Sequence, residues 1–151
     1  MAALSAGIVF AAATVGFTAT MPSIPTWYAG LAKPFFTPPN WVFGPAWTFL
    51  FALMAYAFWR VLTLPPETPG RREAIAAFLV QLALNALWSV VFFGLHSPGG
   101  GMFVVMAMWL AIAVNIGRFQ PLDTVAAWCL APYLAWVTFA AALNFGIWLK
   151  N

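Results

Sequence analysis

The sequence predicts an all-α integral membrane protein, built as a bundle of five transmembrane helices with a long first loop acting as a lid. The 151 residues are 64% hydrophobic and only 6% charged, whereas a soluble domain carries roughly 25% charged residues. So few charges cannot cover a surface that faces water. Five long apolar runs predict the five helices, and one aromatic, proline-rich connection predicts the lid.

Each apolar run approaches or exceeds the roughly 20 residues that a helix needs to cross a bilayer. Nothing alternates with period two, and backbone groups in lipid must bond internally, so we expect helices rather than a β-barrel. The expected spans cover about residues 3–21, 42–64, 74–95, 101–119 and 124–149 of a single domain, residues 1–151. No Lys or Arg precedes the first span, so we expect it to be retained rather than cleaved as a signal peptide.

Three of the four connections are short and carry Pro or Gly, which mark turns. They read LPPETPGRRE, HSPGGG and RFQPLD, at residues 64–73, 96–101 and 118–123. Short connections make consecutive helices antiparallel neighbours. The four arginines, at positions 60, 71, 72 and 118, then share the side of the N-terminus, while Lys33 and Lys150 lie on the other side. The positive-inside rule predicts a cytoplasmic N-terminus.

The remaining connection is long, and from Trp27 to Phe49 it reads WYAGLAKPFFTPPNWVFGPAWTF. It holds four prolines, seven aromatic rings up to Trp47, and one charge, Lys33. Prolines prevent one regular helix and limit the conformational freedom of the loop. We interpret this aromatic loop as the lid of a pocket for a flat apolar ligand.

Polar side chains in the third span share one helix face, because Gln81, Asn85 and Ser89 are spaced four residues apart. Such side chains are costly in hydrocarbon and turn toward the bundle interior. Two interpretations stay open at this point. The three residues either hydrogen-bond to neighbouring helices, or they line a pocket and bond to its ligand.

Aromatic residues near the span ends fit the interfacial belt of membrane proteins; these are Trp27, Tyr28, Trp59 and Trp148. Trp109 and Trp136 lie near the middle of their spans, where an indole N–H needs a partner. Two helical stripes are also present: Trp47, Phe51, Met54 and Phe58 on the second span, and Tyr133, Trp136, Ala140 and Asn144 on the fifth. Stripes usually reflect packing, but their convergence beneath an aromatic loop favours a shared pocket.

Several kinds of chemistry are excluded. No acidic residue lies well inside a span, and the sequence holds no plausible catalytic triad and no phosphate-binding loop. The single Cys129 rules out an internal disulfide and a cysteine metal site, and His96 stands alone in a turn. Six Lys and Arg spread along the chain form no basic patch for nucleic acid.

The segment WYAGLAKPFFTPPNWVFGPAWT resembles the W-Y-x-x-L-x-K-P-x-x-x-P-P-x-x-x-F/I-G-x-x-W motif of the TspO/MBR family. This family comprises the tryptophan-rich sensory proteins and the translocator protein, also called the peripheral benzodiazepine receptor. QLALNALWSVVFFG, residues 81–94, and PYLAWVTFAAALNFGIW, residues 132–148, resemble its third-helix and fifth-helix patterns. The resemblance covers about residues 4–150 and suggests a bacterial member.

The resemblance implies a pocket for porphyrins such as protoporphyrin IX and haem, and for isoquinoline carboxamide and benzodiazepine ligands, in a protein that is usually a homodimer. The family's pocket positions fall on Tyr28, Pro38, Trp47, Asn85, Trp136 and Ala140, and Gln81 joins them as a polar neighbour of Asn85. No metal and no obligatory cofactor is expected. A relaxed form of the family's sterol pattern falls on Leu143, Phe145 and Lys150.

Three functions follow as expectations. The first is a membrane-embedded tetrapyrrole-binding protein acting as sensor, regulator or carrier. The second is a light- and oxygen-dependent enzyme that degrades porphyrin, with catalytic roles for Trp47 and Trp136. The third is a tetrapyrrole or sterol transporter, although no intramembrane ionisable residue or inverted repeat supports coupled transport. The expected cellular location is a bacterial cell membrane or outer membrane, or the mitochondrial outer membrane in a eukaryote.

Overall fold

The computed structural model describes residues 1–151 and contains helices and connections but no strand. The helices are α1 (Ala2–Thr20), α2 (Phe43–Leu62), α3 (Arg71–Ser89), α4 (Pro98–Phe119), α5 (Thr124–Cys129) and α6 (Ala131–Lys150). One π-helical turn, Val90–Gly94, extends α3, and two short 3₁₀ turns, Tyr28–Gly30 and Asn40–Val42, lie in the first connection. Five helical segments are long and apolar enough to cross a membrane, which confirms the predicted fold class.

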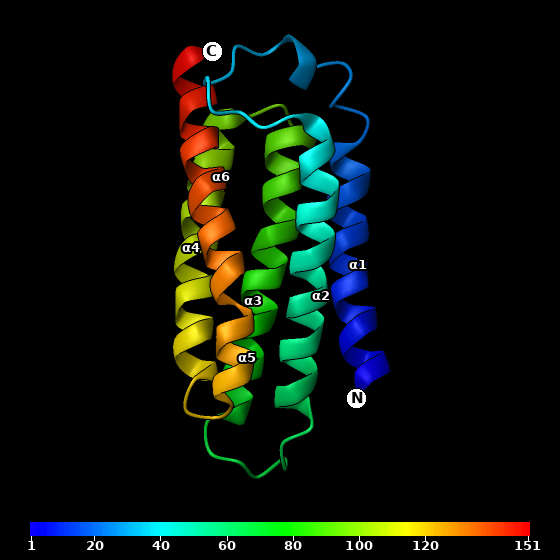
Figure 1. Cartoon of the computed structure of the whole chain (residues 1–151), viewed down its shortest axis with the longest axis vertical. Helices are drawn as coiled ribbons and strands as arrows, with labels where there is room; N and C mark the ends of the chain where they lie inside the picture. Colours follow the sequence, from blue (N-terminus) through cyan, green and yellow to red (C-terminus); the bar gives the residue numbers. More distant parts are fainter.

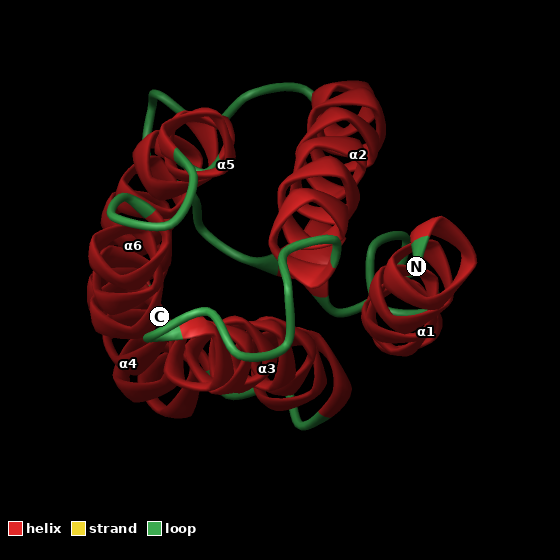
Figure 2. Cartoon of the chain, turned by 90° about the horizontal axis from the view of Figure 1, so that it is seen from below, coloured by secondary structure: helices red, strands yellow, loops and turns green.

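The segments run up and down and form a closed ring (Figures 1 and 2). In the ring, α1 packs on α2 and α3, α3 packs on α4, α4 packs on α6, and α5 returns to α2. The first connection crosses the end of the bundle at which α6 and the chain end (Figure 1). The N-terminus lies at the opposite end, with the α2–α3 and α4–α5 turns (Figure 1).

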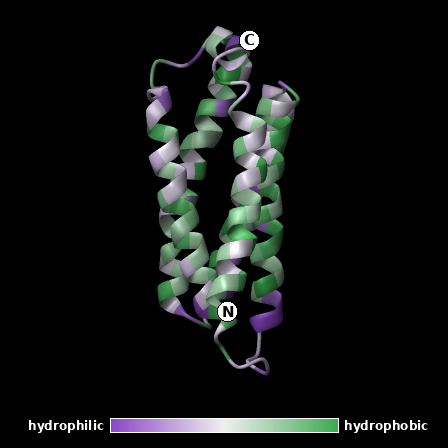
Figure 3. Ribbon diagram, turned by 90° about the vertical axis from the view of Figure 1, so that its right-hand side faces the viewer, coloured by the Kyte–Doolittle hydropathy of each residue, from purple (hydrophilic) through white to green (hydrophobic).

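The hydropathy of the residues changes along the length of the bundle. The most hydrophilic residues gather near the two ends of the bundle, and the middle is apolar (Figure 3). Large apolar side chains on the outside of the spans are exposed, including Phe10, Phe17, Phe103 and Leu110. Within a bilayer these side chains face lipid, so their exposure is what an integral membrane protein requires.

The fifth span differs from the single helix that the sequence predicts. It is divided at Leu130 into α5 and α6. Pro132 explains the break, because proline lacks a backbone N–H and its ring clashes with the carbonyl four residues earlier. The N–H of Leu130 bonds instead to the carbonyl of Ala127, at 3.1 Å, which tightens the turn. The break tilts α6 away from the direction of α5 in Figure 1.

The fourth span begins earlier than predicted, because part of the Gly-rich turn is already helical. Ser97 caps α4 by accepting a hydrogen bond from the N–H of Gly100 at 3.0 Å, and Pro98 occupies the first helical position. Proline is favoured there because its missing N–H would have no helical partner. The start predicted from the sequence, residue 101, is therefore about one turn too late, because the glycine-rich segment indicates a turn.

The core is strongest at the end of the bundle near the N-terminus. Phe58 of α2 stacks on Phe78 of α3 with ring centroids 4.1 Å apart, and Phe78 lies 6.1 Å from Phe119 of α4. All three rings are buried. The hydroxyl of Ser5 on α1 donates to the carbonyl of Ala55 on α2 at 2.6 Å. This packed end leaves the other end, beneath the first connection, for a site.

Candidate functional site

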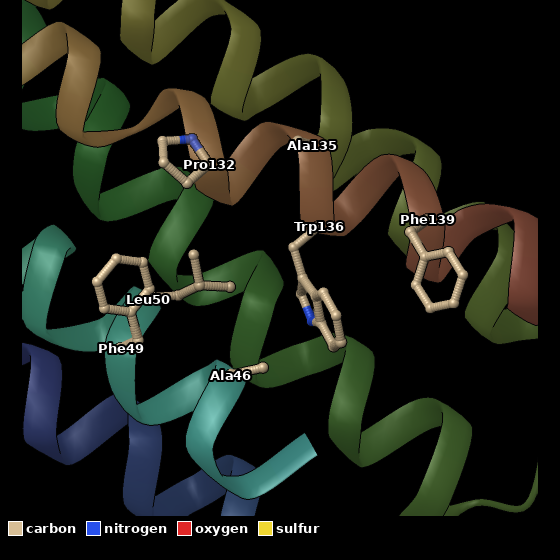
Figure 4. Close-up of a pocket in the computed structure, with 7 residues that line it drawn as sticks. All are labelled: Ala46, Phe49, Leu50, Pro132, Ala135, Trp136 and Phe139. Carbon is tan, nitrogen blue, oxygen red and sulfur yellow. The ribbon is translucent and has the colours of Figure 1, made fainter. Parts of the chain in front are cut away.

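An apolar cleft of about 390 Å³ lies between α2 and α6. Its lining residues are Ala46, Phe49 and Leu50 of α2, and Pro132, Ala135, Trp136 and Phe139 of α6. Figure 4 shows the indole of Trp136 projecting from α6 toward α2. Both walls belong to membrane-spanning segments. A cleft between helices of a bundle is a common place for a ligand.

An aromatic corner backs the cleft. The indole of Trp47 on α2 meets that of Trp136 on α6 edge to face, with centroids 6.5 Å apart and planes at 90°. Trp47 also lies 6.3 Å from Tyr133 and 5.6 Å from Phe51. Edge-to-face contacts of this kind stabilise aromatic clusters beyond the area that they bury. The faces of both indoles are thus held in fixed, mutually perpendicular orientations beside an open apolar space.

A polar contact lies behind the aromatic corner. The side-chain amide of Asn85 on α3 donates to the hydroxyl of Tyr133 at 2.8 Å, and that hydroxyl donates to the sulfur of Met108 at 3.7 Å. All three residues are buried. Asn85 therefore faces the bundle interior, as its helix face predicts, and it bonds to a neighbouring helix in this structure.

Trp109 lies near the middle of its span, and its indole N–H has the hydrogen-bond partner that a polar group needs at this depth in a membrane. Its N–H donates to the hydroxyl of Thr138 on α6 at 2.8 Å. Trp88 on α3 donates in the same way to Asn144 at 3.0 Å, and Asn144 in turn donates to the carbonyl of Pro98 at 2.7 Å. The N–H of Trp136, by contrast, donates to no group of the chain, so it stays free beside the cleft.

The first connection covers the cleft from the end of the bundle. Phe36 of the connection meets Phe139 of the cleft wall with centroids 6.0 Å apart, and Phe43 meets Trp136 at 6.0 Å. Phe36 of the connection and Phe43 at the first position of α2 therefore contact the same side chains that line the space beneath the connection. This geometry is what a lid needs, and it gives the aromatic composition of the loop a structural reason.

Specific contacts hold the lid on the bundle. The side-chain amide of Asn151 accepts from the N–H of Ala32 at 3.1 Å and donates to its carbonyl at 2.8 Å. Pro34 is buried against Gly146 of α6, where any added Cβ would collide with the proline ring. The lid is therefore anchored at two adjacent points on the last turns of α6.

Tyr28 lies at the start of the lid and does not line the cleft. It is buried, its ring lies 5.7 Å from that of Phe93, and the ammonium of Lys33 lies 4.6 Å from its ring centroid. Its hydroxyl has no hydrogen-bond partner in the chain. Burial raises the pKa of the Tyr28 hydroxyl, so the group remains neutral near pH 7.

The structure brings some predicted site residues together and separates others. Trp47 and Trp136 meet at the cleft, and Ala140 lies one turn from Trp136 on the same helix face, half-buried. Pro38 is half-buried in the lid segment before α2. Gln81 is fully buried on α3 without a hydrogen-bond partner, and it does not line the cleft.

The residues of the sterol-like pattern do not share one surface. Leu143 is buried and packs with Tyr28, Phe92 and Ile147, while Phe145 is 45% exposed and Lys150 is exposed at the end of α6. Leu143 and Phe145 thus point in different directions from one helix. A ligand on the outside of α6 would meet only part of the pattern.

Several cleft residues were not singled out from the sequence. Phe43 and Leu50 flank Trp47 at spacings of four and three, and Pro132 and Phe139 flank Trp136 in the same way. Residues at these spacings share a helix face. Adding the residues three and four positions away from Trp47 and Trp136 on each helix would have found them.

Sequence comparison places these features in a known family. The TspO/MBR family matches residues 5–149. The chain is 42% identical over 146 residues to the tryptophan-rich protein TspO of Archaeoglobus fulgidus, which covers 95% of this chain and 94% of that protein. It is 40% identical over 141 residues to the protein CrtK of Rhodobacter capsulatus, covering 93% and 88%.

The likeness extends to a human protein. Translocator protein of Homo sapiens is 36% identical to this chain over 126 residues, covering 83% of this chain and 75% of that protein. The matched region includes the lid, both walls of the cleft and the aromatic corner, since the family match runs through all five spans. This chain is therefore a multi-pass integral membrane protein that belongs to the TspO/MBR family.

Proposed function

We propose that this protein binds a tetrapyrrole, protoporphyrin IX or haem, between α2 and α6 beneath the lid, and acts as a sensor, regulator or carrier of that ligand. The observation that carries this proposal is the apolar cleft walled by Trp136 and backed by the perpendicular indole of Trp47. Indole faces offer flat surface for stacking on a flat, conjugated ring.

The size of the cleft adds a requirement. Its volume of about 390 Å³ lies at the small end of the roughly 300–1,000 Å³ that ligand pockets occupy. A tetrapyrrole therefore needs the lid to lift or α6 to move away from α2. The break at Leu130 gives α6 a place to pivot, and the two anchors of the lid, Gly146 and Asn151, lie on α6 and directly after it.

The carboxylates of such a ligand need cationic or hydrogen-bonding partners. Lys33 is the one charged side chain of the lid, and its ammonium is held by the Tyr28 ring and by the carbonyl of Leu31 at 3.2 Å. We assign to Lys33 the recognition of a propionate. The free N–H of Trp136 is a further donor beside the cleft.

Names of relatives fit a sensory or carrier role. One relative is called a tryptophan-rich sensory protein, from Cereibacter sphaeroides, at 45% identity over 119 residues, and the human relative is called a translocator protein. The same site would take isoquinoline carboxamide and benzodiazepine-type ligands, because these also carry fused aromatic rings and are largely apolar. The homodimer remains a prediction, which mass measurement of the protein in nanodiscs checks.

A binding titration tests the proposal. Protoporphyrin IX is added to protein in lipid nanodiscs, and the shift of the porphyrin absorption band is followed. Trp136→Phe should weaken binding about tenfold, which corresponds to about 1.4 kcal/mol, because the larger stacking face and the free N–H are lost. Trp59→Phe is the matched control, since Trp59 lies at the far end of α2. Equal affinity of both variants would reject this cleft as the site.

A second function has one observation in its favour. Trp47 and Trp136 are electron-rich rings in direct contact beside the cleft, and Tyr133 adjoins them. In this alternative, light excites the bound porphyrin, dioxygen serves as the oxidant, and the indoles relay electrons. The enzyme is supported if the porphyrin absorption is lost in light but not in darkness. This light-dependent loss should not occur in Trp47→Phe or in Trp136→Phe. An unchanged spectrum under light and oxygen rules it out.

A further inference from the structure

Two side-chain amides deep in the bundle have no partner. Gln81 of α3 and Asn115 of α4 are both fully buried, and neither the oxygen nor the nitrogen of either amide hydrogen-bonds to another group of the chain. Both lie within membrane-spanning segments. An amide buried without partners costs free energy, and the hydrocarbon region offers no bulk water to relieve it.

The two amides belong to the same level of the α3–α4 contact. Below them, Phe78 and Phe119 stack with centroids 6.1 Å apart. Gln81 follows Phe78 by three residues and Asn115 precedes Phe119 by four, so in this antiparallel pair each lies one turn further into the bundle on the contacting face. Further into the bundle, Asn85 lies one turn beyond Gln81 and Met108 about two turns beyond Asn115, and both contact the hydroxyl of Tyr133.

The surroundings close this level on both sides. The Phe58, Phe78 and Phe119 stack seals it toward the N-terminal end of the bundle. On the other side, the amide nitrogen of Asn85 donates to the hydroxyl of Tyr133, and no hydrogen bond joins Asn85 to Gln81. The two amides together present two oxygens that accept and two nitrogens that donate, a set that matches water in both directions.

We propose that Gln81 and Asn115 form a buried hydration site, which holds a water molecule bridging α3 and α4 inside the membrane. Buried waters in proteins typically make about three hydrogen bonds to groups that would otherwise be unsatisfied. This assigns to Gln81 a role separate from the ligand cleft. The site is independent of the proposed tetrapyrrole function, because neither residue lines the cleft.

Nuclear magnetic resonance of the full chain in micelles tests the site, with water itself as the probe. Side-chain amides of Gln and Asn are labelled with nitrogen-15, and magnetisation is transferred selectively from water. The side-chain amides of Gln81 and Asn115 should both receive transfer, although both lie in the membrane. In Asn115→Leu the transfer to Gln81 should be lost. Absence of transfer in the wild-type protein, with a direct amide-to-amide cross-peak instead, overturns the proposal in favour of a dry pair.

A stability cycle keeps the test independent of spectra. Gln81→Met and Asn115→Leu should each lower the midpoint of denaturant unfolding, because each leaves the other amide unpaired. The double variant should unfold at a higher denaturant midpoint than the less stable of the two single variants, because it removes both amides and leaves neither one unpaired. Gln120→Leu, an exposed amide after α4, is the control and should leave the midpoint unchanged. Additive losses in the double variant would show that the two amides share no site.

Discussion

At the scale of single residues, the bundle relies on a few polar bonds placed between apolar helices. The Asn85–Tyr133 bond joins α3 to α6 at 2.8 Å, and the Trp88–Asn144 bond joins the same helices at 3.0 Å. Such bonds between membrane helices contribute modestly, about 0.6 kcal/mol on average and up to about 1.7. Their value lies equally in fixing the rotation of each helix, because an amide turned toward lipid would lose its partner.

Asn85→Leu is therefore expected to destabilise the fold by about 1 kcal/mol. The substitution leaves the buried Tyr133 hydroxyl with only the weak sulfur contact to Met108. Reversible unfolding in mixed micelles measures the change. Tyr133→Phe should cost a similar amount, and the double variant should cost less than the sum of the two. Strict additivity would mean that the two side chains do not interact.

At the scale of elements, the start of α5 depends on a carboxylate. Asp123 accepts from the N–H of Ala126 at 3.0 Å as an N-terminal cap, and from the guanidinium of Arg60 at 2.8 Å. Partial burial alone would raise the pKa of Asp123, but these two hydrogen bonds outweigh it and lower the pKa below its usual value. The pair ties α2 to α5 beside the break in the fifth span.

This lowered pKa predicts a dependence of stability on pH. Because the folded state favours the carboxylate, the stabilisation is complete above the unfolded pKa of about 3.9, and it is lost as the pH falls through the lower folded value. Asp123→Asn should reduce the thermal midpoint at pH 7, and its difference from the wild type should shrink at pH 3. Gln120→Ala, at an exposed position with no titratable group, should show no such convergence.

The seat of the lid on α6 yields another prediction. Gly146→Ala should dislodge the lid, because the new Cβ would collide with Pro34. Faster proteolysis within residues 28–40 and at least a several-fold loss of porphyrin affinity are expected. Gly117→Ala is the matched control, because that helical position on α4 has open space for a Cβ. If both variants are cleaved at the same rate, Pro34 does not anchor the lid.

At the scale of the whole molecule, charge is divided between the two ends of the bundle. Arg60, Arg71, Arg72 and Arg118 lie in or next to the helix ends on the N-terminal side, and Lys33 and Lys150 lie on the side of the lid. The positive-inside rule therefore predicts that the lid faces away from the cytoplasm when the chain inserts into an inner membrane. A ligand would then reach the lid from the outer side.

A topology assay measures this orientation. A phosphatase that is active only outside the cytoplasm is fused after Asn151, and a fluorescent protein that matures in the cytoplasm is fused before Met1. Both reporters should be active in a bacterial inner membrane. Replacing Arg71 and Arg72 by Gln should reduce the bias toward this orientation. An inactive phosphatase after Asn151 together with a non-fluorescent reporter before Met1 would contradict the assignment.

Much of this architecture was readable from local sequence. Hydropathy and length predicted all five spans, and the i, i+4 spacing of Gln81 and Asn85 predicted their burial, which the structure confirms. The division of the fifth span at Leu130 was missed, although Pro132 signalled it. The cleft residues Phe49 and Phe139 were also missed, because a helical stripe shows which residues share a face and not which helix that face meets.

The sequence by itself determined that this chain lies in a membrane as five helices under an aromatic lid. Lipid cannot satisfy a backbone amide, so a run of apolar residues has one structural outcome there whatever surrounds it. Only the tertiary structure decided that α2 faces α6 across an apolar cleft, that Trp47 meets Trp136, and that Gln81 is buried without a partner instead of lining the cleft. These pairings depend on how each helix is rotated, and that rotation is set by packing between side chains far apart in the chain.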